Sequence, residues 1–155
     1  MSRVARSARV ASRQRVETLS GAKTIATAET GELYLVTAAS TVTLPAAQDG
    51  AYFKFVFGAD VTSASALVIL TSPVDTMMAG CIRIHVEGST GAATDFAAAA
   101  QAATVDNHDK LTIGDAAKIV HPGSTVECFS DGTNWFVTGF IWAEHADITA
   151  VFGDQ

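Results

Sequence analysis

Residues 52–57 read Tyr-Phe-Lys-Phe-Val-Phe, and this stretch decides the fold class. Successive side chains of a β-strand point to opposite faces, so the three phenylalanines share one face while Tyr52, Lys54 and Val56 share the other. A face made only of phenylalanine predicts a strand that packs against a hydrophobic core. The turn residues Asp49-Gly50 and Gly58 bound this strand on its two sides.

The rest of the chain repeats the same pattern of short β-branched or aromatic runs between turn signals. The gaps between these runs are too short for helical crossovers, which disfavours a doubly wound parallel sheet. The sequence therefore predicts one all-β domain over residues 22–155, a compact antiparallel β-sandwich or barrel of jelly-roll type. The expected strands are 23–28, 33–37, 41–44, 52–57, 67–71, 81–87, 111–113, 125–130 and 134–141.

The composition is that of a folded protein. Hydrophobic residues make up 48% of the 155 residues and charged residues 17%, far from the composition of disordered chains. No apolar run approaches the roughly 20 residues of a membrane-spanning helix, so no membrane span is expected.

Cys81 and Cys128 lie far apart in apolar runs, which predicts buried thiols rather than a zinc site, and one disulfide between them stays compatible with the sequence.

Charge divides the chain into a basic arm and an acidic body. Residues 1–23 carry six basic side chains and one acidic, a charge of +5, whereas residues 24–155 carry four basic and fifteen acidic, a charge of −11, for a total of −6. An acidic body repels phosphate backbones, so no nucleic-acid partner is expected. The basic arm is suited to an acidic surface, either another protein or a neighbouring copy of the same body.

We define the arm as residues 1–21. Its composition is shared by organelle transit peptides, nucleic-acid tails and assembly arms. Valines recur between the arginines, which favours an arm that orders on a partner surface over a solvated tail. The residues expected to bind the partner are Arg3, Val4, Arg6, Arg9, Val10, Arg13, Arg15 and Val16.

The last predicted hairpin has apolar side chains on both faces. Trp135, Val137 and Ile141 lie on one face, and bulky aromatic residues alternate with them on the other. A strand that buries both faces is either an inner strand or part of a subunit interface, and we expect an interface and a trimer. The candidate interface residues, including two from the apolar tail at 143–152, are Phe136, Phe140, Trp142, Ile148 and Val151.

Two further segments are informative about local structure and chemistry. In the small-residue stretch 88–104, Asp95 is placed to cap a short helix over 96–100, and a loop packed on another subunit is the alternative. The polar segment 105–110 offers oxygen ligands for calcium, but it lacks the EF-hand spacing, so a solvated turn is favoured.

No enzymatic motif is present in the sequence. There is no phosphate-binding glycine loop, no Gly-x-Ser-x-Gly and no His-Glu-x-x-His, and the four histidines are scattered, with His85 expected on the outer face of its strand. We therefore predict no catalytic residue, no cofactor, no metal and no small-molecule substrate, and the chain is not expected to be an enzyme.

Two segments carry a family resemblance. They are Glu29-Thr-Gly-Glu-Leu-Tyr-Leu-Val36 with Thr41-Val-Thr-Leu-Pro-Ala-Ala47, and Ser130-Asp-Gly-Thr-Asn-Trp-Phe-Val-Thr-Gly139. Together they resemble β domains of tailed-phage virion proteins, a group that includes capsid decoration (cement) proteins, head fibres and tail-fibre modules. The resemblance covers about residues 20–142.

The resemblance implies a homotrimer that is made in the host cytoplasm and binds the major capsid protein on the outer surface of the phage head, where it stabilises the shell. The absence of heptads, collagen repeats or a long shaft favours a cement protein over a fibre. The alternative is a head-fibre or tail-fibre module that binds a host receptor or glycan, with exposed aromatic residues such as Trp142 or Tyr34 stacking on sugars.

Overall fold

The computed structural model describes residues 14–74, 76–86, 94–100, 108–144 and 149–155. These residues form twelve strands and one short 3₁₀ helix, so the all-β prediction is confirmed. The strands are β1 (Val16–Leu19), β2 (Ala22–Thr24), β3 (Leu33–Val36), β4 (Ser40–Thr43), β5 (Asp49–Phe57), β6 (Val61–Leu70), β7 (Met78–Val86), β8 (Thr94–Ala100), β9 (Lys110–Val120), β10 (Thr125–Asp131), β11 (Trp135–Ala143) and β12 (Thr149–Gly153), and the 3₁₀ helix is Thr27–Glu29. Among the described residues there is no helix long and apolar enough to cross a membrane.

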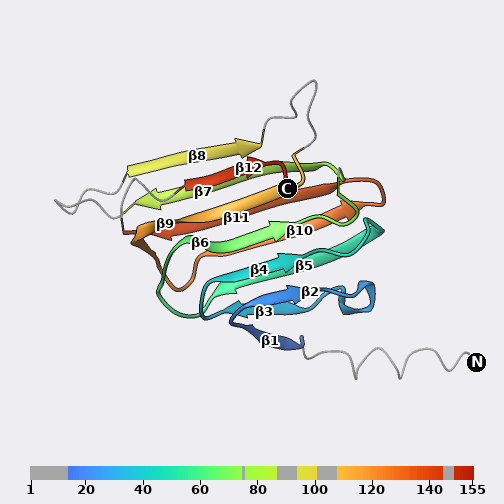
Figure 1. Ribbon diagram of the computed structural model, residues 1–155, viewed down its shortest axis with the longest axis horizontal. Helices are drawn as coiled ribbons and strands as arrows, with labels where there is room; N and C mark the ends of the chain where they lie inside the picture. The colour runs from blue at the N-terminus through green and yellow to red at the C-terminus, as the bar shows by residue number, and fades with distance from the viewer. Residues whose placement is uncertain (1–13, 75, 87–93, 101–107, 145–148) are drawn as a thin grey trace, which may run out of the picture.

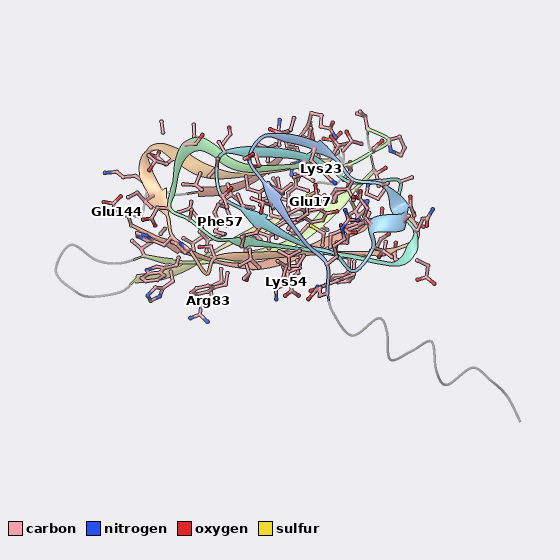
Figure 2. All side chains as sticks on the ribbon, turned by 90° about the horizontal axis from the view of Figure 1, so that it is seen from below. Glu17, Lys23, Lys54, Phe57, Arg83 and Glu144 are labelled. Carbon is pink, nitrogen blue, oxygen red and sulfur yellow. The ribbon has the colours of Figure 1, made fainter. Side chains whose placement is uncertain are left out.

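The strands form two layers, which overlie each other in Figure 1 and are seen edge-on in Figure 2. One layer has seven strands in the order β1-β3-β5-β10-β11-β7-β8, and the other has five in the order β2-β4-β6-β9-β12. A single residue pair, Ala143 with Val120, joins the layers into one continuous ladder. The architecture is therefore a β-sandwich with its two layers linked at β11 and β9.

The strand pairing is mixed rather than wholly antiparallel as predicted. β1, β3 and β5 are parallel neighbours in one layer, and β2, β4 and β6 are parallel neighbours in the other. The chain alternates between the layers over these six strands, so each return to a layer runs in the same direction. A strand of the opposite layer thus serves as the crossover that parallel neighbours require.

The core lies between the two layers. Phe53, Phe55 and Phe57 are buried there, as their alternation predicts, and Figure 2 shows Phe57 between the layers. Tyr34 stacks on Phe55 with ring centroids 5.4 Å apart, and Trp135 packs beside Phe53 at 5.7 Å. Burial of large aromatic side chains at these positions supplies a major part of the folding free energy.

Several local predictions need correction. Residues 96–100 belong to strand β8 instead of a short helix, because pairing with β7 outweighs the helix propensity of four consecutive alanines. The predicted strand 23–28 ends at Thr24 and is followed by the 3₁₀ helix. Residues 16–19, assigned from sequence to the arm, pair with β3 as strand β1. The expected apolar tail does add a strand, β12, at the edge of the five-stranded layer.

Candidate interaction surface

The candidate interaction surface is the outer side of the seven-stranded layer. Its side chains alternate with core residues along each strand. We call this surface the outer sheet face and define it by Val16, Thr18, Leu33, Leu35, Tyr52, Lys54, Val56, Cys81, Arg83, His85, Thr125, Glu127, Phe129, Phe136, Thr138, Phe140 and Trp142.

Exposed apolar side chains are concentrated on this face. Among the described residues five large apolar side chains are exposed, and four of them lie here: Val16 (57%), Phe129 (45%), Phe140 (41%) and Trp142 (41%). The fifth, Val74 (58%), lies in the connection between β6 and β7. Single exposed apolar residues are ordinary, but a group of them on one sheet face indicates an interaction surface.

The aromatic side chains are arranged by the strand register. Phe129 of β10 is opposite both Tyr52 of β5 and Phe136 of β11, so the three side chains form a row across the sheet. The Phe129 and Phe136 rings are stacked, with centroids 5.3 Å apart and planes inclined by 22°. Stacking of this kind stabilises cross-strand pairs and holds the rings in a fixed orientation.

A second aromatic group lies toward the other end of β11. His85 stacks on Phe140 with centroids 6.2 Å apart, and the His121 ring packs against Trp142 at 5.0 Å. The Nδ1 atom of His121 lies 2.9 Å from Oδ1 of Asp60, which fixes the imidazole beside the indole.

The charges at the centre of the outer sheet face neutralise each other. Lys54 Nζ donates a 2.7 Å hydrogen bond to Glu127 Oε1 across the β5–β10 pair. This hydrogen bond raises the pKa of Lys54 and lowers the pKa of Glu127. Arg83 projects from the same outer side of the molecule as Lys54, as Figure 2 shows. The Lys54–Glu127 pair is therefore neutral as a unit, and Arg83 adds a positive charge to this face although the body of the chain is acidic.

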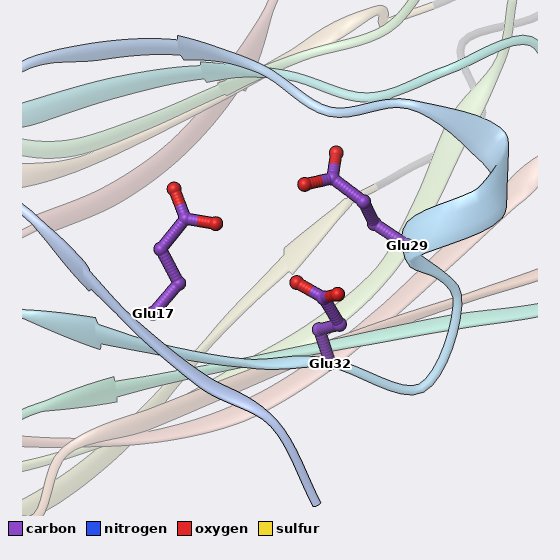
Figure 3. A group of neighbouring side chains, drawn as sticks. All are labelled: Glu17, Glu29 and Glu32. Atoms are coloured by element: carbon purple, nitrogen blue, oxygen red, sulfur yellow. The ribbon is translucent and has the colours of Figure 1, made fainter.

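A group of carboxylates occupies the edge where β1 and β2 end the two layers. Oxygen atoms of Glu17, Glu29 and Glu32 lie within 4.8 Å of one another, and Figure 3 shows the three side chains converging. Such a group resembles a set of hard-cation ligands. Here, however, Lys23 Nζ lies 2.8 Å from both Glu17 and Glu29 and supplies the positive charge, while Arg15 binds Glu32 at 2.9 Å.

The cluster is held by strong electrostatic coupling. Burial of the Lys23 ammonium group lowers its pKa, but the hydrogen bonds that it donates to Glu17 and Glu29 outweigh burial and leave the pKa above the ordinary value. The hydrogen bond from Lys23 holds the pKa of Glu29 below its ordinary value. Glu17 is in register with the core residue Tyr34, and Lys23 with the core residue Val42, so both charged side chains point into the space between the layers.

The structure does not assemble a catalytic triad in the part of the chain that it describes. His121 and Asp60 are in contact, and Ser124 lies nearby, which is the residue set of a hydrolase. Ser124 is fully buried, however, and its hydroxyl group donates to the carbonyl oxygen atoms of His121 and Trp142 and accepts from the Trp142 amide. This serine stabilises the connection between β9 and β10, and it is not placed to attack a substrate.

The predicted interface residues are only partly brought together. Phe136, Phe140 and Trp142 lie on the outer sheet face as a group, whereas Val151 belongs to β12 of the other layer and Ile148 lies outside the described residues. Phe129, the most exposed aromatic residue among the described side chains, was not predicted from sequence. Its alternation with Val126 and Cys128, which are buried, is the signal that identifies it.

The arm residues fall into two groups. Arg3, Val4, Arg6, Arg9, Val10 and Arg13 lie outside the described residues. Arg15 pairs with Glu32 of the same chain, and Val16 begins β1 at the border of the outer sheet face. The partner expected for Arg15 is thus supplied by the chain itself, whereas the Val16 side chain is exposed.

Three other sequence predictions are corrected by burial. Tyr34 is completely buried, so it has no surface with which to stack on a sugar. Cys128 is buried as predicted, and burial raises the pKa of its thiol, but Cys81 is exposed on the outer sheet face. Asp109 is buried instead of solvated, with Oδ1 accepting a 2.7 Å hydrogen bond from the Gln155 amide. Residues 105–107 of the same polar segment lie outside the described residues.

Comparisons with known proteins identify no relative: no family model, no curated protein and no solved structure matches this chain.

Proposed function

We propose that this protein is a structural component of a phage virion, a capsid decoration (cement) protein that binds the outer surface of the head as a trimer and stabilises the shell. The observation that carries the proposal is the outer sheet face, where four of the five large exposed apolar side chains of the described residues are gathered on one surface. Such a surface suits a protein that works by assembly with other proteins. The resemblance of the segments 29–47 and 130–139 to phage virion proteins selects this kind of assembly.

Decoration would stabilise the shell through thermodynamic linkage. A protein that binds the intact shell and not its dissociated parts lowers the free energy of the intact state by an amount that grows with occupancy. Three arms on one trimer act together, so that contacts that are weak singly become strong collectively. The arginines of residues 1–13 supply charge for an acidic patch on the major capsid protein.

The test is co-sedimentation of the purified protein with undecorated heads assembled from the major capsid protein of the same phage. We expect the full chain to bind and a variant lacking residues 1–13 to bind at least about tenfold more weakly, a loss of about 1.4 kcal/mol. The truncation stops before Gln14 because β1 pairs with β3 and its removal would damage the fold. A full chain that does not sediment with the heads contradicts the proposal.

A second candidate is a fibre module that binds a host glycan. It is favoured by Trp142, whose indole ring is exposed and is held in position by His121. Exposed aromatic rings on a rigid sheet are suited to stacking on sugar rings. Binding on a glycan array that is lost in Trp142→Ala, without binding to heads, would favour this function over decoration.

A further inference from the structure

We infer that the outer sheet face is the surface on which a second copy of this chain docks, and that repetition of this contact builds the oligomer. That copies dock on this face is inferred from the face itself, whereas the expected number of three copies in the oligomer rests on the proposed function. The outer sheet face then binds sister copies, and the basic arm binds the shell.

The first argument is the position of the exposed apolar side chains. Phe129 projects from β10, Phe140 and Trp142 project from the neighbouring strand β11 toward its end, and Val16 lies at the border of the face. The Phe129–Phe136 and His85–Phe140 ring stacks hold the central side chains in place, so little conformational entropy is lost when a partner covers them.

The second argument is charge. The body of the chain carries −11 over residues 24–155, so two copies repel each other through most surfaces. On the outer sheet face the Lys54–Glu127 pair is neutral as a unit. Of the other residues that define the face only Arg83 carries a full charge, and this charge is positive, so the face lacks the net negative charge that makes the rest of the body repel another copy. Aromatic side chains and arginine are enriched at interfaces between proteins.

The third argument concerns the edge strands β1 and β2, which offer another route to self-association by strand pairing. Glu17 and Lys23 point inward from these strands and form a charged cluster with Glu29. Inward-pointing charges on edge strands disfavour edge-to-edge pairing, because an added strand would bury the cluster. At this side of the sandwich, docking through the sheet face is therefore favoured over extension of the sheet.

The fourth argument is area. Six strands of the face, from β1 to β7, span about 24 Å at the usual strand spacing, and four alternating side chains along a strand span about 20 Å. The face then contributes about 500 Å² per copy, or about 1,500 Å² in total for three copies that meet on it. Each contact between two copies covers only part of the face, so the closed ring of three is needed for stability.

The experiment measures mass in solution by sedimentation velocity and light scattering at micromolar concentration. We expect the wild-type chain to form an oligomer, with three copies as the expected number, and Phe140→Glu to be monomeric. Val74→Glu is the matched control, since it adds the same charge at an exposed apolar residue away from the face, and it should keep the wild-type mass. Thermal melting of both variants checks that they are folded.

A second measurement needs no variant. Cys81 lies on the face, opposite Thr138 of β11, and is exposed in the single chain. We expect its alkylation by a neutral maleimide to be at least about tenfold slower at a concentration where the oligomer forms than after dilution into monomers. The buried Cys128 thiol should react slowly at both concentrations and serves as the internal control.

Several results overturn the inference. They are a wild-type monomer at micromolar concentration, an oligomer that persists in folded Phe140→Glu, an equal loss of mass in Val74→Glu, or a Cys81 thiol that reacts at the same rate at both concentrations. The outcome is separate from that of the co-sedimentation test. A monomer that still binds heads would contradict this inference and the trimeric state but not the decoration role, whereas a face-dependent oligomer that does not bind heads would contradict the proposed function alone.

Discussion

At the scale of single residues, the packing of β11 against its neighbouring strands requires one position without a side chain. Gly139 lies on the inward side of β11, in register with Val126 of β10 and Ile82 of β7. The Ile82 side chain fills the space over this glycine. A Cβ atom at position 139 would lie 2.6 Å from the Thr125 carbonyl oxygen and 2.8 Å from Ile82 Cδ1.

We therefore expect Gly139→Ala to lower the free energy of unfolding by about 1–3 kcal/mol, because a backbone atom of β10 must move to admit the methyl group. Urea denaturation followed by tryptophan fluorescence measures the change. Gly21→Ala is the matched control, since no atom lies within 4 Å of a Cβ there, and it should be neutral or slightly stabilising. Equal stability of Gly139→Ala and wild type would show that the sheet adjusts without cost.

At the scale of secondary-structure elements, the charged cluster connects the edge strands of the two layers and the 3₁₀ helix. Lys23 of β2 binds Glu17 of β1 and Glu29 of the 3₁₀ helix, and its Nζ atom lies 5.6 Å from the centroid of the Tyr34 ring. β1 and β2 are only four and three residues long and lie at the ends of their layers. The lysine thus holds the last strands of both layers together.

Replacement of this lysine by an isosteric apolar side chain, Lys23→Met, should lower the free energy of unfolding by about 1–3 kcal/mol at neutral pH, because two carboxylates lose a charged hydrogen-bond partner. The matched control is Lys54→Met, which breaks the more exposed pair with Glu127 and should cost about 0–1 kcal/mol. Chemical denaturation at pH 7 compares the two. Equal losses in both variants would contradict a special role for the cluster.

The same cluster predicts a dependence on pH. The pKa of Glu29 is lower in the folded chain than its ordinary value of 4.5, so its contribution is fully present above that value and is lost as the pH falls through the depressed pKa. The pKa of Lys23 is raised above 10.5, so its contribution is lost only as the pH rises through that higher value. Stability should therefore fall more steeply below pH 4.5 in wild type than in Lys23→Met, as acid denaturation series of the two proteins will measure.

At the scale of the whole molecule, apolar and charged surfaces are separated, and the two proposed contacts should respond differently to salt. The outer sheet face groups exposed apolar side chains around the neutral Lys54–Glu127 pair, whereas residues 1–13 carry four arginines and no acidic side chain. Salt screens attraction between exposed charges within a Debye length of about 10 Å at 0.1 M, but it does not weaken apolar contacts.

We expect an increase from about 0.05 M to about 0.5 M NaCl to leave the oligomer mass unchanged and to reduce co-sedimentation with heads by at least about tenfold. Sedimentation velocity and the head-binding assay in the same buffers measure the two effects. Loss of the oligomer at high salt would indicate that charge, and not the aromatic face, joins the copies.

Much of the fold follows from local pattern. The alternation in residues 52–57 and 135–141 predicts both the strands and their buried faces, because side chains of a strand alternate with a period of two wherever the strand lies. The outward position of Phe136, Phe140 and His85 was predicted in this way. The same rule applies to Phe129, which shows that local pattern is informative wherever a strand is recognised.

What the sequence by itself determined is therefore the all-β class, most strands, and which side chains share a face. Only the tertiary structure decided which strands are neighbours, and so which residues meet: the parallel pairs formed by alternation between layers, the row of Tyr52, Phe129 and Phe136, and the cluster around Lys23. The exposure of Cys81 and the burial of Asp109 belong to the same group. The physical reason is that alternation is a property of each strand, whereas pairing depends on contacts between segments far apart in the chain, which minimise the free energy of the whole molecule together.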